Sequence, residues 1–149
     1  MKKLLAFNVL LTLVIAFALT GCGDDDSESY APTYGKMVFN PNPAAVGDSV
    51  NVVVEQTRKG YGLEKTTYSW TITFGIMEED GTLRDSVRTI THTTNYDGLD
   101  NSDPKVGFTI PSNCVSRNAT VSLSATFSGY IGNNLFLKAN KTGTLTVTD

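Results

Sequence analysis

The sequence predicts an all-β fold, an antiparallel β-sandwich of about seven strands, on the basis of three observations. Apolar and polar residues alternate over several short segments between residues 36 and 149, which is the period of a strand with one buried face. No segment keeps an apolar period of about 3.6 residues over three helical turns. Clusters of Gly, Pro, Asn and Asp separate the segments, as turns do in an antiparallel sandwich.

The alternation defines the expected strands and their buried faces. Five segments are clear, namely 49–55, 67–74, 105–110, 119–127 and 143–148. In the second of these, Trp70 is expected inward while Ser69 and Thr71 point outward. Weaker strands are expected at 37–39 and 87–93, with 135–139 as a further candidate. The segment 87–93 is so polar that we expect it at a sheet edge.

The first 21 residues have the pattern of a signal peptide. Lys2 and Lys3 form a short cationic region, and an apolar run follows over residues 4–19. A transmembrane helix is the alternative, but it needs about 20 apolar residues to cross the hydrocarbon core. This run instead ends in small residues followed by three aspartates. We therefore expect a cleaved signal.

The residues at the end of this signal, Leu19-Thr20-Gly21-Cys22, resemble the lipobox of bacterial type II signal peptides. The resemblance implies cleavage after Gly21, a diacylglycerol on the sulfur of Cys22 and an acyl chain on its new amino group. Several buried chains give lasting attachment to a membrane, because each buried methylene contributes about 0.8 kcal/mol. The alternative is an ordinary signal cut near Gly21 that leaves Cys22 as a free thiol.

Residues 22–35 are expected to form the lipidated cysteine and an acidic, flexible tether, followed by one folded domain over residues 36–149. Asp24, Asp25 and Asp26 directly behind Cys22 resemble the lipoprotein export signal of the Bacteroidota type. That resemblance implies an outer-membrane lipoprotein facing the cell exterior. The alternative is that these acids only keep the tether solvated and that the anchor faces the periplasm.

The overall charge excludes one class of partner. The chain has 12 Lys and Arg against 15 Asp and Glu, a net charge of −3. Lys2 and Lys3 lie within the signal, and Asp24 to Asp26 lie behind the anchor, so the folded part is near neutral. It has no basic stripe of the kind that binds nucleic acid, and we expect no nucleic-acid binding.

Several short motifs together resemble a bacterial immunoglobulin-like domain of the type found in surface lipoproteins. They are Pro43, Val46-Gly47-Asp48-Ser49-Val50, Tyr68-Ser69-Trp70, Gly129-Tyr130 and Gly143-Thr144-Leu145-Thr146-Val147. The resemblance implies an immunoglobulin-like sandwich in which Trp70 is the buried tryptophan of the third strand. The chain lacks the paired cysteines and the tyrosine corner of antibody domains.

The sequence supplies few residues for catalysis or metal binding. His92 is the single histidine, and it lies in a polar Thr-rich run where an exposed strand position explains it. If Cys22 carries lipid, Cys114 has no partner for a disulfide, and we expect it to be a small buried residue. The acids Glu78, Glu79 and Asp85 are the candidates for a carboxylate pair that would hydrolyse a glycosidic bond. They fall on or beside an expected turn, where acids are common in any protein. We predict no enzyme activity, no cofactor and no metal site.

One loop contains the oxygen ligands that calcium prefers, between Asp97 and Asp103. It lacks the spacing of an EF-hand, and a solvated loop is the favoured interpretation. Two tripeptides, Asp48-Ser49-Val50 and Asp85-Ser86-Val87, resemble the O-glycosylation acceptor of exported Bacteroidota proteins. Ser86 is the better candidate of the two, because it lies near a turn.

These observations lead to a functional hypothesis with one main alternative. We expect a non-catalytic cell-envelope lipoprotein, held to the membrane by its lipid, whose immunoglobulin-like module binds a glycan or a protein partner through its loops. Tyr61, Tyr96 and Tyr130 are the aromatic residues suited to that role, or they pack the loops. The alternative is a structural or assembly subunit of a larger envelope complex that uses an exposed strand edge.

Overall fold

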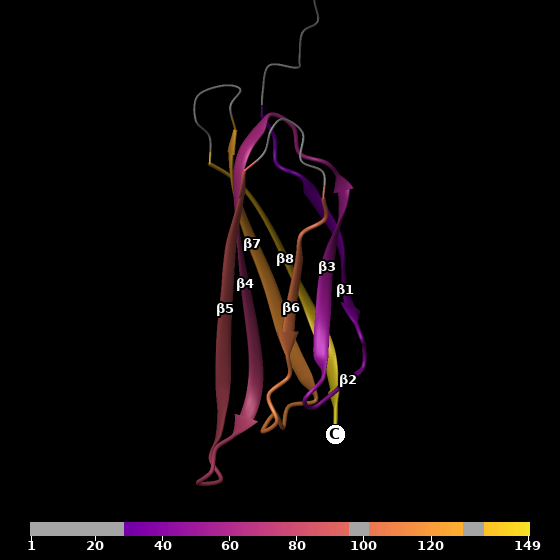
Figure 1. Cartoon of the computed structure of the whole chain (residues 1–149), viewed down its shortest axis with the longest axis vertical. Coiled ribbons are helices and arrows are strands. Elements are labelled where there is room, and N and C mark those ends of the chain that lie inside the picture. Colours follow the sequence, from indigo (N-terminus) through magenta and orange to yellow (C-terminus); the bar gives the residue numbers. More distant parts are fainter. Residues whose placement is uncertain (1–28, 96–101, 130–135) are drawn as a thin grey trace, which may run out of the picture.

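The computed structural model describes residues 29–95, 102–129 and 136–149, and it confirms the all-β prediction (Figure 1). The strands are β1 (Thr33–Asn40), β2 (Ala44–Ala45), β3 (Ser49–Arg58), β4 (Leu63–Met77), β5 (Leu83–Asn95), β6 (Lys105–Thr109), β7 (Asn118–Gly129) and β8 (Phe136–Thr148). In this part of the chain, no helix is long and apolar enough to cross a membrane.

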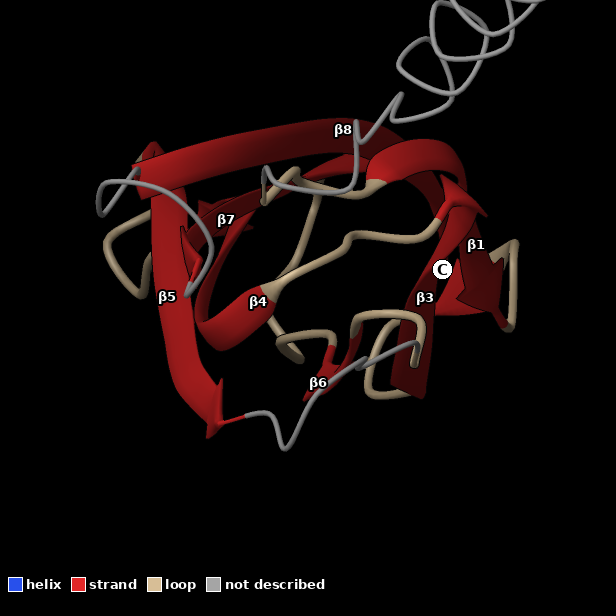
Figure 2. Ribbon diagram, turned by 90° about the horizontal axis from the view of Figure 1, so that it is seen from above, coloured by secondary structure: helices blue, strands red, loops and turns tan. Residues whose placement is uncertain are grey.

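The strands form two sheets that pack face to face (Figure 2). One sheet has the order β1-β3-β6 and the other the order β2-β8-β7-β4-β5. Neighbouring strands are antiparallel except for β2, which pairs with β8 in parallel through Ala44 and Ala45. Trp70 lies buried on β4, in the middle of the larger sheet. This arrangement confirms an immunoglobulin-like β-sandwich, with one short parallel pair that the alternation did not predict.

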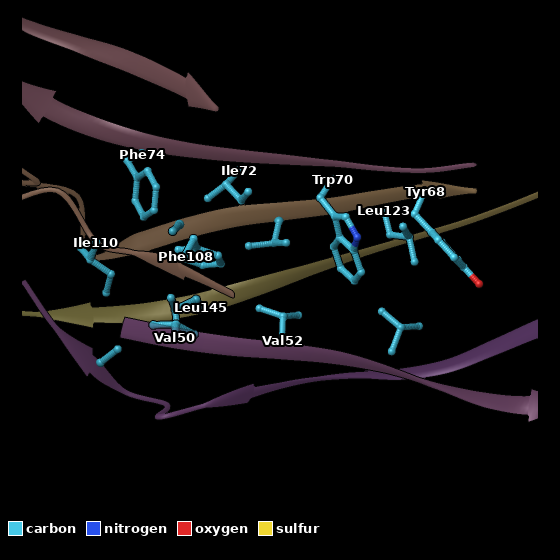
Figure 3. Close-up of a cluster of buried hydrophobic side chains, with 14 of the residues drawn as sticks. Val50, Val52, Tyr68, Trp70, Ile72, Phe74, Phe108, Ile110, Leu123 and Leu145 are labelled. Atoms are coloured by element: carbon cyan, nitrogen blue, oxygen red, sulfur yellow. The ribbon is translucent and has the colours of Figure 1, made fainter. Parts of the chain in front are cut away.

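The core lies between the sheets and follows the predicted alternation. On β4, Tyr68, Trp70, Ile72 and Phe74 are buried, and on β3 the three valines Val50, Val52 and Val54 face them. Figure 3 shows the Trp70 ring reaching from β4 toward Val52. Phe74 and Phe108 meet edge to face, with ring centroids 5.8 Å apart. The side chains that interdigitate here therefore come from strands far apart in the sequence.

The folded part begins before the expected boundary at Lys36. Strand β1 starts at Thr33, whose partner on β3 is Arg58, and Tyr34 lies opposite Gln56. Upstream of it, the Ser29 hydroxyl donates to the Gly62 carbonyl at 2.6 Å. The prediction of a flexible tether is thus wrong for residues 29–35. An irregular register between Tyr34 and Met37 turns both residues toward the core, which breaks the period of two that marks a strand in the sequence.

Two other strands are longer than their sequence patterns indicate. The expected pieces 135–139, from Phe136 on, and 143–148 belong to one strand, β8. It pairs with β7 from Phe136 opposite Ser128 to Thr146 opposite Asn118. The expected strand 87–93 is the middle of β5, and it lies at the edge of its sheet as predicted. Backbone pairing with a neighbour holds residues in a strand even where their side chains do not alternate.

Candidate interaction surface

The outer face of the five-stranded sheet is covered by hydroxyl side chains, which we call the hydroxyl face. The alternation that buries Trp70 on β4 and Leu123 on β7 turns their serine and threonine neighbours outward. The hydroxyl face comprises Thr67, Ser69, Thr71 and Thr73 of β4, Thr89, Thr91 and Thr93 of β5, Thr120, Ser122, Ser124 and Thr126 of β7, and Thr142 and Thr144 of β8.

Strand register arranges these hydroxyls in rows. Thr71 lies opposite Thr89 of β5 on one side and Ser122 of β7 on the other, and Ser122 in turn lies opposite Thr142 of β8. Neighbours within a row are about 4.8 Å apart, and rows are about 6.8 Å apart along the strands. Some neighbours bond directly: the oxygens of Thr67 and Thr93 are 3.2 Å apart, and those of Ser122 and Thr142 are 3.1 Å apart.

Charged side chains are confined to the ends of this face. Lys138 lies in the row of Thr67 and Thr126, next to Lys65 at one end, and Asp85 lies at the other end. The two central rows hold only Thr, Ser and Asn140. A hydroxyl both donates and accepts hydrogen bonds without carrying charge. The face is therefore suited to a neutral polar partner, such as a sugar polymer or a polar protein surface.

A second feature lies at the far end of the same sheet, around the turn between β4 and β5. A solvent-open hollow of about 860 Å³ is lined by Glu78, Asp80, Arg84 and Asn113, among others. Glu78 and Arg84 form an ion pair. The Thr82 hydroxyl and its backbone N–H donate to Asp80 Oδ1 at 2.6 and 2.9 Å, and these bonds hold the pKa of Asp80 below its usual value. Glu78, Asp80 and Arg84 are thus engaged within the turn itself.

The residues predicted for the anchor and its sorting lie outside the described part of the chain. These are Cys22, Asp24, Asp25 and Asp26, and the same holds for Tyr96 and Tyr130. Tyr61 is described and packs within the fold. Its ring stacks on Tyr30 with centroids 5.8 Å apart, and Arg58 lies over the Tyr30 ring at 4.6 Å. For Tyr61 the loop-packing interpretation is therefore favoured over ligand binding.

The two candidate glycosylation serines both lie on strands. Ser86 is half-buried on β5 opposite Phe74, so its side chain is on the core-facing side of the sheet. Ser49 is exposed at the start of β3, with its hydroxyl 3.3 Å from that of Thr109. The predicted position of Ser86 near a turn holds only approximately, since β5 begins at Leu83.

The candidate catalytic residues lie apart. His92 is exposed on β5 and its ring lies 5.0 Å from that of Tyr68 on β4. Cys114 is buried as predicted, and its backbone bridges Ile76 near the other end of β4. Eight positions along a strand separate Tyr68 from Ile76, which is about 26 Å at roughly 3.3 Å per residue. His92 and Cys114 therefore cannot form a catalytic pair.

Only the end of the candidate calcium loop is described, at Ser102 and Asp103. Asp103 accepts a hydrogen bond from the Gln56 backbone N–H at 3.0 Å, and the Ser102 carbonyl accepts one from the Gln56 amide at 2.6 Å. These bonds fasten the loop to β3. Within residues 29–95, 102–129 and 136–149, no group of three or more His, Cys, Asp or Glu side chains could hold a metal ion.

Comparison with known proteins adds little to this description. No family model and no curated protein matches the chain. Similar solved structures include the sporulation control protein of Bacillus subtilis, at 14% identity and a TM-score of 0.38, over 80% of this chain and 50% of that one. They also include a cohesin module of a Clostridium perfringens family 33 glycoside hydrolase, at 15% identity and a TM-score of 0.42, over 77% of this chain and 97% of that one.

The chain thus spans half the length of the sporulation control protein. The fold is assigned from the strand order and pairing of this chain, and not from these two structures, whose TM-scores are 0.38 and 0.42.

Proposed function

We propose that the protein is a non-catalytic lipoprotein of the cell envelope whose sandwich binds a neutral glycan or a polar protein surface through the hydroxyl face. The uncharged central rows of that face are the observation that carries the binding role. The lipobox-like residues ending at Cys22 are the basis for the proposed membrane anchor. Asp24 to Asp26 are the basis for the proposed location on the outer face of the membrane. The hydroxyl face is preferred to Tyr61 as the binding surface because the Tyr61 ring is stacked on Tyr30.

The ends of the described chain are compatible with attachment through Cys22. The described chain begins at the end of the sandwich where Tyr30 pairs with Tyr61, and its C-terminus lies at the opposite end (Figure 1). A lipid at Cys22 would attach the domain from the first of these ends. The long axis of the strands would then lead away from the membrane, and the hydroxyl face would be open along its side.

Fractionation of cells tests the anchor and its sorting separately. Cys22→Ser removes the sulfur that would carry the diacylglycerol, so the protein should leave the membrane fraction or accumulate with its signal uncut. Replacing Asp24, Asp25 and Asp26 by alanine should keep membrane association but abolish cleavage by protease added to whole cells. Unchanged surface exposure in the triple variant would show that the acids serve only as a tether.

Ligand binding by the full chain tests the hydroxyl face. A glycan array and a pull-down from surface-labelled cells would identify the class of ligand. Ser124→Arg places a charge in a central row and should lower the affinity for that ligand about tenfold. The matched control is Asn51→Arg, an exposed position on β3 of the other sheet, which should bind like the wild type. Equal loss in both variants would contradict a role for this face.

A second candidate function, an assembly subunit of an envelope complex, is favoured by a different observation. Strand β5 is 13 residues long and lies at the edge of its sheet. A free edge of this length presents backbone donors and acceptors that another protein can use.

A further inference from the structure

Among the described strands, β5 pairs on one side only, so 13 residues of backbone form an edge of the sheet. This edge has few of the features that usually prevent another strand from pairing with it. Its register with β4 runs without a shift from Lys65 opposite Asn95 to Met77 opposite Leu83. The strand contains no proline, and its charged residues, Arg84, Asp85 and Arg88, all lie in its first half. Sheet edges are usually blunted by bulges, prolines, charges or short length. Strand β6, at the nearest edge of the other sheet, has only five residues, and the two do not pair (Figure 2).

An exposed apolar patch lies beside the first half of β5. Seven large hydrophobic residues are exposed in the described chain, and four of them gather at this end: Met77, Leu83, Val87 and Val115. Leu83 is 67% exposed and Val87 is 61% exposed. They share the outer face of β5, because their partners on β4 are Met77 and Thr73. Exposed apolar side chains that lie near one another are the kind of surface on which another molecule can pack.

A hollow of about 610 Å³ adjoins this patch. Leu83 and Asp85 of β5 line one side, Val115 and Ser116 the other, and Gly75 of β4 lies between them. Ser116 is held against Gly75, whose N–H donates to the Ser116 hydroxyl at 3.1 Å. The hollow lies over Gly75 of β4, on the side of β5 away from its unpaired edge.

The other face of β5 carries two arginines, of which Arg84 forms the ion pair with Glu78 described above. Arg88 lies opposite Ile72, and Arg84 lies opposite Ile76, so both side chains are on the core-facing side of the sheet. Both are exposed, since the neighbouring side of the sandwich is not covered by another described strand. A strand added along this half of the edge would therefore meet Leu83, Asp85 and Val87 on one face and the two arginines on the other.

We propose that β5 binds an extended segment of a partner protein whose apolar residues alternate with acidic ones. The segment would extend the sheet through backbone hydrogen bonds, set an apolar side chain against Leu83 or Val87, and set a carboxylate near Arg88. Main-chain pairing supplies affinity and the alternate side chains supply specificity. This proposal deepens the assembly alternative and does not depend on the lipid anchor or on the hydroxyl face.

In two symmetric registers, the charges of β5 disfavour pairing with a second copy of this chain. Symmetric pairing of two β5 strands about Ser86 would place Arg84 directly opposite the second copy's Arg88. Pairing about Arg88 would place that residue opposite itself. Like charges in directly opposite positions are unfavourable.

Peptide binding to the full chain in detergent tests the proposal. The probes are a synthetic peptide in which valine alternates with glutamate and a control in which valine alternates with lysine. The glutamate peptide should bind and the lysine peptide should not. Arg88→Glu should weaken the glutamate peptide about tenfold and improve the lysine peptide. Leu83→Ser should weaken binding, whereas Phe136→Ser, which changes an exposed apolar residue on β8, should leave it unchanged.

Three outcomes would overturn the proposal. The first is equal binding, or no binding, of the two peptides to the wild type. The second is equal binding of the glutamate peptide to the Leu83→Ser variant and the wild type, with thermal unfolding showing both folded. The third is a dimer in sedimentation that excess glutamate peptide does not dissociate, which would assign the edge to a second copy. Failure of the hydroxyl face in the glycan array would leave these results unaffected.

Discussion

The two long sides of the sandwich are built differently. On the closed side, β1 of one sheet lies against β8 of the other, and the chain crosses between the sheets so that β2 pairs with β8. A side chain at Gly143 would come within 2.8 Å of the Met37 sulfur and 3.0 Å of Phe39 Cζ, so the sheets meet tightly there. On the open side, β5 pairs only with β4 and β6 only with β3 among the described strands (Figure 2).

This difference assigns different roles to the two sides: the closed side contributes to the stability of the fold, and the open side is available for binding. The closed side packs β1 onto β8, and β2 pairs with the end of β8 there. The open side leaves unpaired strand edges and exposed Leu83 and Val87 beside them. A substitution on the closed side should therefore change the free energy of unfolding, while one on the open side should change binding.

The largest expected effect belongs to the core that joins the two sides. Trp70→Ala should lower the free energy of unfolding by about 3–5 kcal/mol, because the fully buried ring would leave a cavity between two rigid sheets. Chemical denaturation measures it. The matched control is Thr71→Ala, whose side chain points outward from the next position, with an expected change within about 0.5 kcal/mol. Similar stability of the two variants would show that the Trp70 ring does not hold the sheets together.

A pair of glycine substitutions compares the two sides directly. Gly143→Val should lower the free energy of unfolding by about 1–3 kcal/mol, because its side chain would push β1 away from β8. At Gly107, on β6 at the open side, an added Cβ would lie 3.3 Å from the Asn51 side-chain oxygen and 3.9 Å from the Val50 carbonyl oxygen. Gly107→Val should change the free energy of unfolding by less than about 0.5 kcal/mol. Denaturation midpoints measure both. Equal losses would contradict the distinction between the sides.

The smallest expected effect at neutral pH concerns Tyr34 on β1. Burial raises the pKa of Tyr34 above its ordinary value of 10.0, and the neighbouring Tyr68 adds to the shift. The native state therefore keeps the phenolic proton where the unfolded chain releases it, so the free energy of unfolding falls as the pH rises above 10.0. Below that value this contribution is fully present.

Tyr34→Phe should remove this contribution to the loss of stability at alkaline pH. At neutral pH it should change stability by less than about 0.5 kcal/mol, because the buried hydroxyl has no hydrogen-bond partner among the described residues. Urea titrations at neutral and alkaline pH, on wild type and variant, measure the difference. Parallel declines of the two proteins above pH 10.0 would show that Tyr34 ionises as in an unfolded chain.

The buried faces were predictable wherever the alternation is regular. Tyr68, Trp70, Ile72 and Phe74 are buried as expected, since a strand with one solvated face must place alternate residues inside. The start of β1 was not predictable, because its register shift puts Tyr34 and Met37 on the same side. The middle of β8 was not predicted as a strand for another reason. Lys141 faces inward there with its side chain half-buried, which interrupts the apolar alternation.

By itself, the sequence determined the class of fold, the inward residues, the turns and the polar character of β5, because each depends on neighbours along the chain. Only the tertiary structure decided how the strands are grouped into sheets. That grouping aligns the Ser and Thr residues of four strands into rows, leaves β5 at an edge, and brings Val115 next to Leu83. The physical reason is that the period of a strand is local, whereas its partners are chosen by pairing and packing between residues far apart in sequence.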